Sequence, residues 1–330
     1  MPASAPSHKE RWAPAAKATN LSVLVTTLVR VLLDAILRGQ SGVISRAQAR
    51  DAGLSNDQVD RRVASGRWAA VYPGVYRLTD RDLCDEARLR AVGLWAGDGA
   101  TLTGLAAAWW HGLTTTAPST VEVTVPTNRS LRARPGTKVR RRDLSELDRV
   151  ATRGQWVSAI PLTVLEAATV LGEDGSRLLD AALQRRVRFE TLRKAYCRNL
   201  GGHGSAAAKR LLAAASDRAA SAAERTAIGL LRAARLTGWQ THYRVRGYEL
   251  DIAFPEHQIA IEVDGWAWHH DTRTFQTDRT RQNALVLAGW TILRFTWHDL
   301  TTRPTQVIAE IHAALNQDHR FSARNRENRG

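Results

Sequence analysis

The sequence predicts a mixed α/β (α+β) fold, and three observations indicate it. Near the N-terminus, two short helical segments joined by a glycine turn and followed by two short strands predict a winged helix-turn-helix. Near the C-terminus, two apolar runs that alternate with period two predict a strand hairpin between helices. With 44% hydrophobic and 24% charged residues in a chain of 330, the composition is that of a globular protein able to bury two or three cores.

The charge of the chain is strongly basic. Its formal net charge of +15 suits a polyanion such as nucleic acid, or an anionic membrane surface. A GC-rich genome explains why Arg outnumbers Lys, but it does not explain the net excess of cations. The charge therefore favours a nucleic-acid partner, which we expect to be DNA.

Cysteine usage and apolar stretches exclude several other classes. Cys84 and Cys197 are far apart and exclude a disulfide scaffold and a zinc cluster. The apolar stretch 21–37 is interrupted by Arg30 and Asp34 before the ~20 residues that a membrane span needs. The basic leader without a small-residue cleavage site also argues against a secretory signal. We expect a cytoplasmic protein with no membrane association.

The first predicted parts are a leader and a winged helix. Residues 1–18 show no apolar period and are predicted to form a disordered leader. The next domain, 19–80, begins with a helix over 21–38 that ends at Gly39. It continues with helices over 45–52 and 55–65, the second capped by Ser55, and with wing strands over 68–72 and 74–78.

The second helix of this pair is the predicted recognition helix. Arg61, Arg62 and Arg67 lie on it or directly after it, where such proteins contact phosphates and guanine edges. Spacing alone leaves open a small helical bundle whose arginines are only solvated. However, "GVISRAQARDAGLSNDQVDRRVASGRW" followed by "VYPGVYRL" resembles the N-terminal winged-helix domain of AbiEi-type antitoxins, over about residues 21–80. The resemblance implies promoter binding, and it leaves open a toxin partner and a homodimer.

Residues 81–216 predict an α/β middle domain without recognisable chemistry. Six basic residues between 132 and 142 form the densest basic run of the chain. This run either contacts phosphates or belongs to half-exposed strand faces. The predicted elements are helices over 82–95, 103–110, 177–192 and 204–215, and strands over 121–125 and 137–142.

Four acidic residues face one another in a hairpin predicted over 248–265. With its turn at the Pro-Glu-His-Gln segment, Asp251 lies opposite Glu262, and Glu249 lies opposite Asp264. Directly opposed like charges, with Cβ atoms roughly 5 Å apart, destabilise a sheet. The acidic face therefore predicts a bound cation, and the other face is a core of Leu250, Ile252, Phe254, Ile259, Ile261 and Val263.

The last domain, 217–318, lies before a basic tail at 319–330 and resembles a nuclease. Its elements are expected in the order αβββαβ, with Glu224, Asp251 and the triplet 262–264 at the acidic positions of PD-(D/E)XK nucleases. More closely, "IAIEVDGWAWHH" followed by "DRTRQNALVLAGWTILRF" resembles the very-short-patch-repair endonucleases. The resemblance implies a restriction-endonuclease-like core that hydrolyses phosphodiester bonds with Mg²⁺ or Mn²⁺.

The acidic residues have the chemistry that such a core needs. Hard cations such as Mg²⁺ prefer carboxylate oxygens and keep several waters. Asp251 and Glu262 are therefore the expected metal ligands, with the Val263 carbonyl as a third. Glu224 would approach from the preceding helix, directly or through water. Its alternative role is a capping box with Ser221, at the start of a predicted helix.

The triplet departs from the nuclease pattern at its last position. The usual triplet ends in Lys, whereas this one ends in Asp264. His269 matches a His of the very-short-patch-repair branch, and an imidazole that titrates near pH 6.5 can act as a general base. We expect His269 to take that role, with Asp264 either adding a ligand or orienting His269.

Two further pairs of residues have both functional and structural interpretations. Arg279 and Arg281, on a helix predicted over 274–288, either clamp the phosphate backbone or pair with Asp278 on the helix surface. The tryptophans at 266 and 268 either wedge between bases or pack in the core.

The sequence therefore predicts a metal-dependent DNA endonuclease that its winged helix targets to DNA. The alternative is an antitoxin-type DNA-binding transcriptional regulator with a catalytically silent nuclease-like domain, which the missing Lys favours. A structural protein whose acids bind a stabilising ion has the least support. Because the acids Glu224, Asp251 and Glu262 and also His269 are all present, we expect the protein to be the endonuclease and not the silent regulator.

Overall fold

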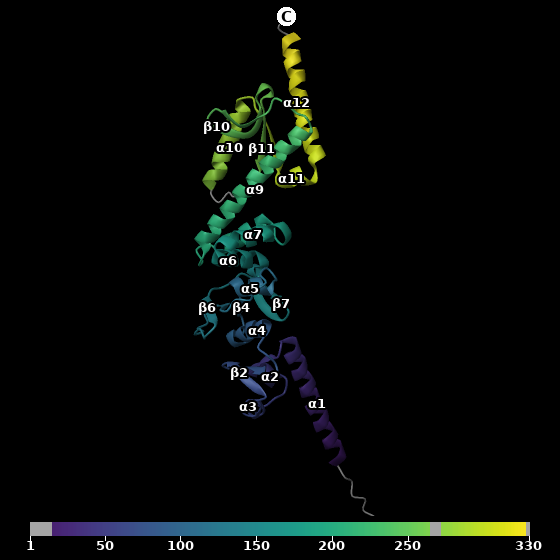
Figure 1. Ribbon diagram of the computed structural model, residues 1–330, viewed down its shortest axis with the longest axis vertical. Coiled ribbons are helices and arrows are strands. Elements are labelled where there is room, and N and C mark those ends of the chain that lie inside the picture. Colours follow the sequence, from purple (N-terminus) through teal and green to yellow (C-terminus); the bar gives the residue numbers. More distant parts are fainter. Residues whose placement is uncertain (1–14, 265–271, 328–330) are drawn as a thin grey trace, which may run out of the picture. The chain divides into compact units, whose positions relative to one another are not determined.

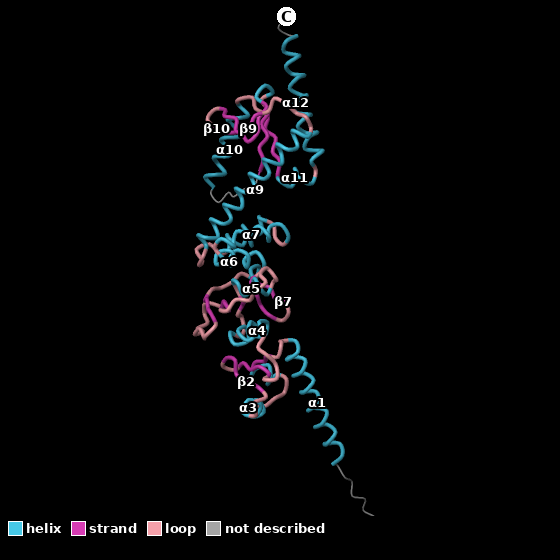
Figure 2. The backbone as a smooth tube through the Cα atoms, in the orientation of Figure 1, coloured by secondary structure: helices cyan, strands magenta, loops and turns pink. Residues whose placement is uncertain are grey.

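The computed structural model describes residues 15–264 and 272–327 (Figure 1). The chain divides into two compact units, Met1–Ala167 and Ala168–Gly330. Helices and strands are mixed in both units, as Figure 2 shows, and the predicted α/β class is confirmed. Among the described helices, none is long and apolar enough to cross a membrane.

The first unit opens with the predicted winged helix. Its three strands form a sheet in the order β1-β3-β2, of which β1 was not predicted. Ser55 caps α3 in a capping box with Gln58, as the sequence indicates. The elements are α1 (Ala15–Gly39), β1 (Val43–Ser45), α2 (Arg46–Asp51), α3 (Asn56–Ala64), β2 (Trp68–Tyr72) and β3 (Val75–Leu78).

A small core holds the winged helix together. Leu33 and Leu37 of α1 pack with Ile44, Val59 and Trp68, all at most 8% exposed. Helix α1 begins at position 15 and so includes the end of the segment 1–18 that was predicted to be a disordered leader. The sequence there is rich in Ala, which favours a helix. One face of α1 therefore belongs to the winged-helix core.

The rest of the first unit is a five-stranded sheet in the order β6-β5-β4-β8-β7. Three of the six basic residues between 132 and 142 form ion pairs with acids of the same unit. Lys138 and Arg140 lie 3.1 and 2.8 Å from the Glu122 carboxylate, and Arg142 pairs with Glu166. These charges therefore stabilise the fold. The elements are α4 (Asp85–Ala96), β4 (Thr101–Leu102), α5 (Gly104–Trp110), β5 (Val121–Val125), β6 (Thr137–Arg141), η1 (Glu146–Asp148), β7 (Arg149–Thr152), β8 (Gln155–Ser158) and α6 (Ile160–Leu171).

The second unit contains the predicted αβββαβ core. Its sheet has the order β12-β11-β10-β9, with β11 and β12 parallel and the other pairs antiparallel. The elements are α7 (Glu173–Arg185), α8 (Phe189–Arg198), α9 (Ser205–Ala233), β9 (Gln240–Val245), β10 (Tyr248–Phe254), η2 (Pro255–His257), β11 (Ile259–Asp264), α10 (Thr272–Leu287), β12 (Thr291–Thr296), α11 (Trp297–Thr302) and α12 (Pro304–Glu327).

Helix α9 is longer than the sequence predicts. The prediction that a new helix begins at Ser221, with a capping box to Glu224, is wrong, because Ser221 lies exposed in the interior of α9. The segment 205–228 contains neither Gly nor Pro and is rich in Ala, so no residue ends the helix there. Glu224 is therefore a mid-helix residue that is available for tertiary contacts.

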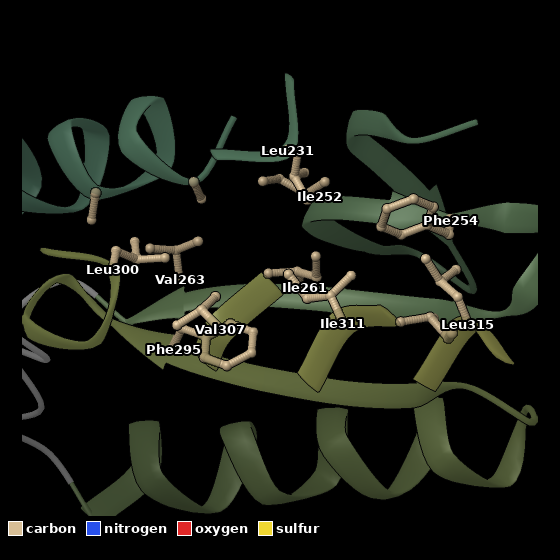
Figure 3. Packing of buried hydrophobic residues seen from close by; sticks show 13 residues of the cluster. Leu231, Ile252, Phe254, Ile261, Val263, Phe295, Leu300, Val307, Ile311 and Leu315 are labelled. Carbon is tan, nitrogen blue, oxygen red and sulfur yellow. The ribbon is translucent and has the colours of Figure 1, made fainter. Parts of the chain in front are cut away.

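Apolar side chains cover both faces of the sheet in the second unit. Ile252, Ile261 and Phe295 pack with residues of α9, α11 and α12, including Leu231 and Val307 (Figure 3). This cluster confirms the core face that the hairpin pattern predicts for most of its residues.

The second cluster lies on the side of α10. It contains Leu250, Ala253 and Ala260 together with Leu285 and Trp290. By alternation, the two alanines share the face of the acids, so that face is partly apolar and not a carboxylate cluster alone. Leu250 was predicted to share the face of Ile252 but packs in this second cluster. These two residues pair with Tyr243 and Thr241 of β9. Between those partners lies His242, whose left-handed φ of 50° makes the strand irregular at this point.

Candidate active site at the acidic hairpin

The predicted register of the hairpin is confirmed. Strands β10 and β11 pair Ile252 with Ile261 and Phe254 with Ile259. Continued by one residue, the same register places Asp251 opposite Glu262. The turn is formed by η2 together with the residue after it, at 258, which has a left-handed φ of 50°.

Glu262 is a buried carboxylate with a strong partner. It is 8% exposed, and its Oε1 lies 2.7 Å from the Nη2 of Arg281 on α10. The same nitrogen donates to the backbone carbonyl of Glu249 at 2.7 Å. Burial of a carboxylate is unfavourable unless it is paired. Arg281 was expected either to clamp phosphate or to pair with Asp278, but in the structure it pairs with Glu262.

Asp251 is tied to the neighbouring strand. Its Oδ2 accepts a hydrogen bond from the backbone N–H of Val263 at 2.9 Å. This bond joins the Asp251 side chain to the residue that follows Glu262. Asp251, Glu262 and Val263, which are the three predicted metal ligands, therefore lie on neighbouring strands that this hydrogen bond joins.

Glu224 reaches the same sheet from α9. Its Oε1 lies 3.3 Å from the Nε2 of His242 on β9, and its side chain is 24% exposed. The Nδ1 of His242 lies 3.1 Å from Oε1 of Glu249. His242 is not among the residues predicted from the sequence. The available signal was the polar alternation of Gln, His and Arg at 240, 242 and 244, on a strand next to the acidic one.

The remaining predicted site residues are only partly described. The backbone of Asp264 ends β11 and pairs with Thr296 of the parallel strand β12. His269 and the tryptophans at 266 and 268 lie outside the described residues. Arg279 is exposed on α10. The relation between Asp264 and His269 therefore stays a prediction.

The donor set of the hairpin suits a hard divalent cation. Two opposed carboxylates, Asp251 and Glu262, with a nearby backbone carbonyl match the oxygen ligands of Mg²⁺, which takes its other ligands from water and phosphate. Among the described side chains, no group of three or more His, Cys, Asp or Glu residues is arranged to hold a metal. Arg281 already neutralises one of the two carboxylates, so a cation would compete with it for Glu262.

The predicted DNA-contacting arginines of the winged helix differ in their surroundings. Arg61 and Arg67 are exposed. Arg62 lies over the ring of Trp68, 5.7 Å from its centroid, and donates to the Gln58 carbonyl at 2.9 Å. Burial lowers the pKa of Arg62. Arg61 and Arg67 are therefore better presented to a ligand than Arg62, and the DNA contact itself stays a prediction.

Two segments of the chain match family models. Residues 224–315 match the restriction-endonuclease-like family REase_MTES_1575. Residues 31–79 match AbiEi_4, described as a transcriptional regulator and AbiEi antitoxin. The first match contains Glu224 and the acidic hairpin, and the second contains the helix-turn-helix and its wing.

Similar proteins cover much of the chain. The uncharacterized proteins MT2308 and Rv2248, from two strains of Mycobacterium tuberculosis, are each 29% identical to this chain over 273 residues. These alignments cover 80% of this chain and 98% of each relative.

Two solved structures are also similar in part. The catalytic domain of the homing endonuclease I-Bth0305I is 21% identical, with a TM-score of 0.26, over 29% of this chain and 94% of that one. The RV2827C protein of Mycobacterium tuberculosis is 17% identical, with a TM-score of 0.31, over 58% of this chain and 80% of that one. The two family matches show that the chain carries an AbiEi antitoxin-like domain at its N-terminus and a restriction-endonuclease-like domain at its C-terminus.

Proposed function

We propose that the protein is a metal-dependent DNA endonuclease that hydrolyses phosphodiester bonds and is targeted to DNA by its winged helix. The observation that carries this proposal is the acidic hairpin. Asp251 accepts a hydrogen bond from the Val263 amide, and the buried Glu262 carboxylate pairs with Arg281 of α10. A protein with no use for these carboxylates gains nothing from holding two of them in opposed positions.

Each residue has a proposed role. Asp251 and Glu262, with the Val263 carbonyl, would hold Mg²⁺ or Mn²⁺. Such an ion neutralises charge that develops on the phosphate and lowers the pKa of a bound water. His269 is the proposed base, because it matches a His of the very-short-patch-repair endonucleases that the sequence resembles. Asp264 is proposed either to orient His269 or to add a further ligand.

The arginines of α10 have separate roles in this proposal. Arg281 holds the Glu262 carboxylate in place until a cation binds. Arg279 is exposed on the same helix and is the proposed phosphate contact, a task that suits the fixed donors of a guanidinium.

A second function is favoured by a specific observation. The Arg281–Glu262 ion pair neutralises a ligand position without a metal, and Asp264 stands where nucleases usually keep Lys. Both features fit an antitoxin-type cytoplasmic regulator that binds promoter DNA and carries a silent nuclease-like domain. A toxin partner and a second copy of the chain are the partners that this function would add.

The two functions are separated by incubating the purified full chain with supercoiled plasmid and Mg²⁺ or Mn²⁺. We expect nicking by the wild type, and a loss on the order of 100-fold or more in Asp251→Asn and Glu262→Gln, because the metal ligands supply most of the rate. Glu310→Gln on α12 is the matched control, since Glu310 pairs only at the surface with Arg303. Promoter binding that requires Arg61, without nicking, would favour the regulator.

A further inference from the structure

Helix α1 is apolar on two sides. On one side, Leu33 and Leu37 are buried in the winged-helix core. On the other side, Leu24, Leu28 and Val31 are 61%, 59% and 55% exposed. A helix that is apolar all round is ordinarily buried, and monomeric proteins rarely leave contiguous apolar patches uncovered. The exposed side of α1 therefore indicates a surface that binds a partner.

The exposed apolar residues of α1 have the spacing of a coiled-coil seam. Leu24, Leu28, Val31 and Ala35 follow one another at intervals of four, three and four residues. In the sequence, Leu21 continues this pattern toward the N-terminus, at an interval of three. Alternating intervals of three and four are the a and d positions of a heptad repeat, which pack against the same positions of another helix. We call residues 24, 28, 31 and 35 the α1 seam.

The surface around the α1 seam is broad enough to pack against a second helix. Val25 and Leu32 occupy the neighbouring e positions of the heptad and are exposed as well. A face with apolar a, d and e positions has the width that helices of globular proteins bury. Two heptads are too few to form a helix by themselves, but Leu33 and Leu37 already anchor α1 to the winged helix. Pairing therefore does not have to order the helix first.

A second copy of the same helix fits the α1 seam better than a membrane surface does. A helix that lies on a membrane has a polar side rich in Lys and Arg opposite its apolar side. In α1, the side away from the seam is instead buried in its own domain through Leu33 and Leu37. A heptad stripe is also self-complementary, because two copies related by a twofold axis present the same residues to each other.

We propose that the protein self-associates through the α1 seam, with the α1 helices of two copies paired along it. This inference goes beyond the proposed function, since it assigns a partner to a surface outside the acidic hairpin. Pairing would join two winged helices in one particle, as in dimeric helix-turn-helix proteins that read two half-sites. The association itself needs neither DNA nor metal, so it is tested without them.

The test is the mass of the full chain in solution, measured by sedimentation equilibrium. We expect the wild type to have at least twice the mass of one chain. The double variant Leu24→Glu, Leu28→Glu should associate on the order of 100-fold more weakly or not at all, because every copy loses two buried leucines from the interface. Both side chains are exposed within one chain and Glu is a good helix former, so circular dichroism should show unchanged helix content.

The matched control is the double variant Val170→Glu, Leu200→Glu. These two apolar side chains are 53% and 57% exposed and lie outside α1. The control therefore makes the same change in charge and in exposed apolar surface, and it should associate as the wild type does.

A mixing experiment tests whether α1 contacts α1. Leu28→Glu and Leu28→Lys should each weaken association, because like charges then meet along the α1 seam. An equimolar mixture of the two should associate more tightly than either variant alone, because opposite charges face each other across the paired helices.

A monomeric wild type would overturn the inference, and binding of that monomer to vesicles of anionic phospholipid would assign the α1 seam to a membrane surface instead. Wild-type association in Leu24→Glu, Leu28→Glu, equal loss of association in the control, or a mixture no tighter than its components would also overturn it. Failure of the endonuclease function is distinguishable, because an associated wild type that does not nick plasmid leaves this inference supported.

Discussion

Glu262 and Arg281 show how single residues set the chemistry of this hairpin. A carboxylate that is 8% exposed needs a partner, and Arg281 provides one at 2.7 Å. Removal of one member of a buried ion pair leaves an uncompensated charge, which is more damaging than loss of a surface pair. The pair therefore contributes to folding, and it would compete with the proposed metal for the same oxygen.

The substitution Arg281→Met tests this competition. We expect it to lower the free energy of unfolding by about 2–4 kcal/mol without added metal, because Glu262 is left buried and unpaired. We also expect added Mn²⁺ to stabilise the variant more than the wild type, since the cation replaces the lost guanidinium. Urea unfolding with and without Mn²⁺ measures both effects. Arg279→Met, on the exposed side of the same helix, is the control, and equal stability of the two variants would contradict this account.

At the same scale, the sequence allowed some site residues to be predicted and not others. The opposition of Asp251 and Glu262 could be predicted, because strand periodicity fixes which residues face each other once the turn is placed. The partners Arg281 and His242 could not be predicted. Each comes from another element, and no local pattern states which side chain of a helix or third strand will reach a buried acid.

Among the elements, helix α9 is the clearest departure from expectation. The sequence Ser-Ala-Ala-Glu at 221–224 has the form of a capping box. However, the Ala-rich segment of α9 before it contains no residue that ends a helix. Helix propensity therefore dominated over the cap signal. In contrast, Ser55 follows a glycine turn, so the chain is already non-helical there and the same kind of cap forms.

The two serines give a matched test of these helix assignments. We expect Ser221→Ala to change the free energy of unfolding by less than about 0.5 kcal/mol or to raise it, since Ala is the better residue inside a helix. We expect Ser55→Ala to lower it by about 1 kcal/mol, because it removes the acceptor of the Gln58 N–H bond of 3.2 Å. Urea unfolding of the two variants decides the matter. A loss of about 1 kcal/mol in Ser221→Ala would show that α9 begins at Ser221.

Helix α11, which follows β12, is held by a cap with a predictable pH dependence. The backbone N–H of Thr296, with its hydroxyl, lowers the pKa of Asp299 from 3.8 to about 2. Because the folded pKa is the lower one, the charged cap contributes stability that is fully present above pH 3.8 and is lost as the pH falls through about 2.

The substitution Asp299→Ala is therefore expected to lower the free energy of unfolding by about 1–2 kcal/mol at pH 6. This difference from the wild type should shrink steadily between pH 4 and pH 2, where the carboxyl becomes protonated. Thermal unfolding across that range measures it. A difference that does not change with pH would mean that the cap does not depend on the Asp299 charge.

On the scale of the whole molecule, the sequence predicted the folds near the two ends of the chain better than the fold of its middle. The winged helix and the αβββαβ core each have a local pattern with turn signals, and both were predicted. The middle of the chain was less predictable, because its sheet joins strands in the order β6-β5-β4-β8-β7 through long-range pairs. Half of its basic run also proved to be paired with Glu122 and Glu166, which no local signal indicates.

The net charge of +15 can be understood at this scale as well. Several of the basic residues that looked available for a polyanion are used in ion pairs, which include Arg46 with Asp60 and Arg218 with Asp180. Arg61, Arg67 and Arg279 are exposed and are the proposed contacts to DNA.

The central claim is that the acidic hairpin cuts DNA with the help of a metal. The most direct measurement is the rate at which the purified full chain nicks supercoiled plasmid in Mn²⁺, compared between the wild type and Asp251→Asn. We predict nicking by the wild type that disappears when the metal is chelated, and a rate at least on the order of 100-fold lower in the variant. No metal-dependent nicking by the wild type, or equal nicking by Asp251→Asn, would contradict the claim.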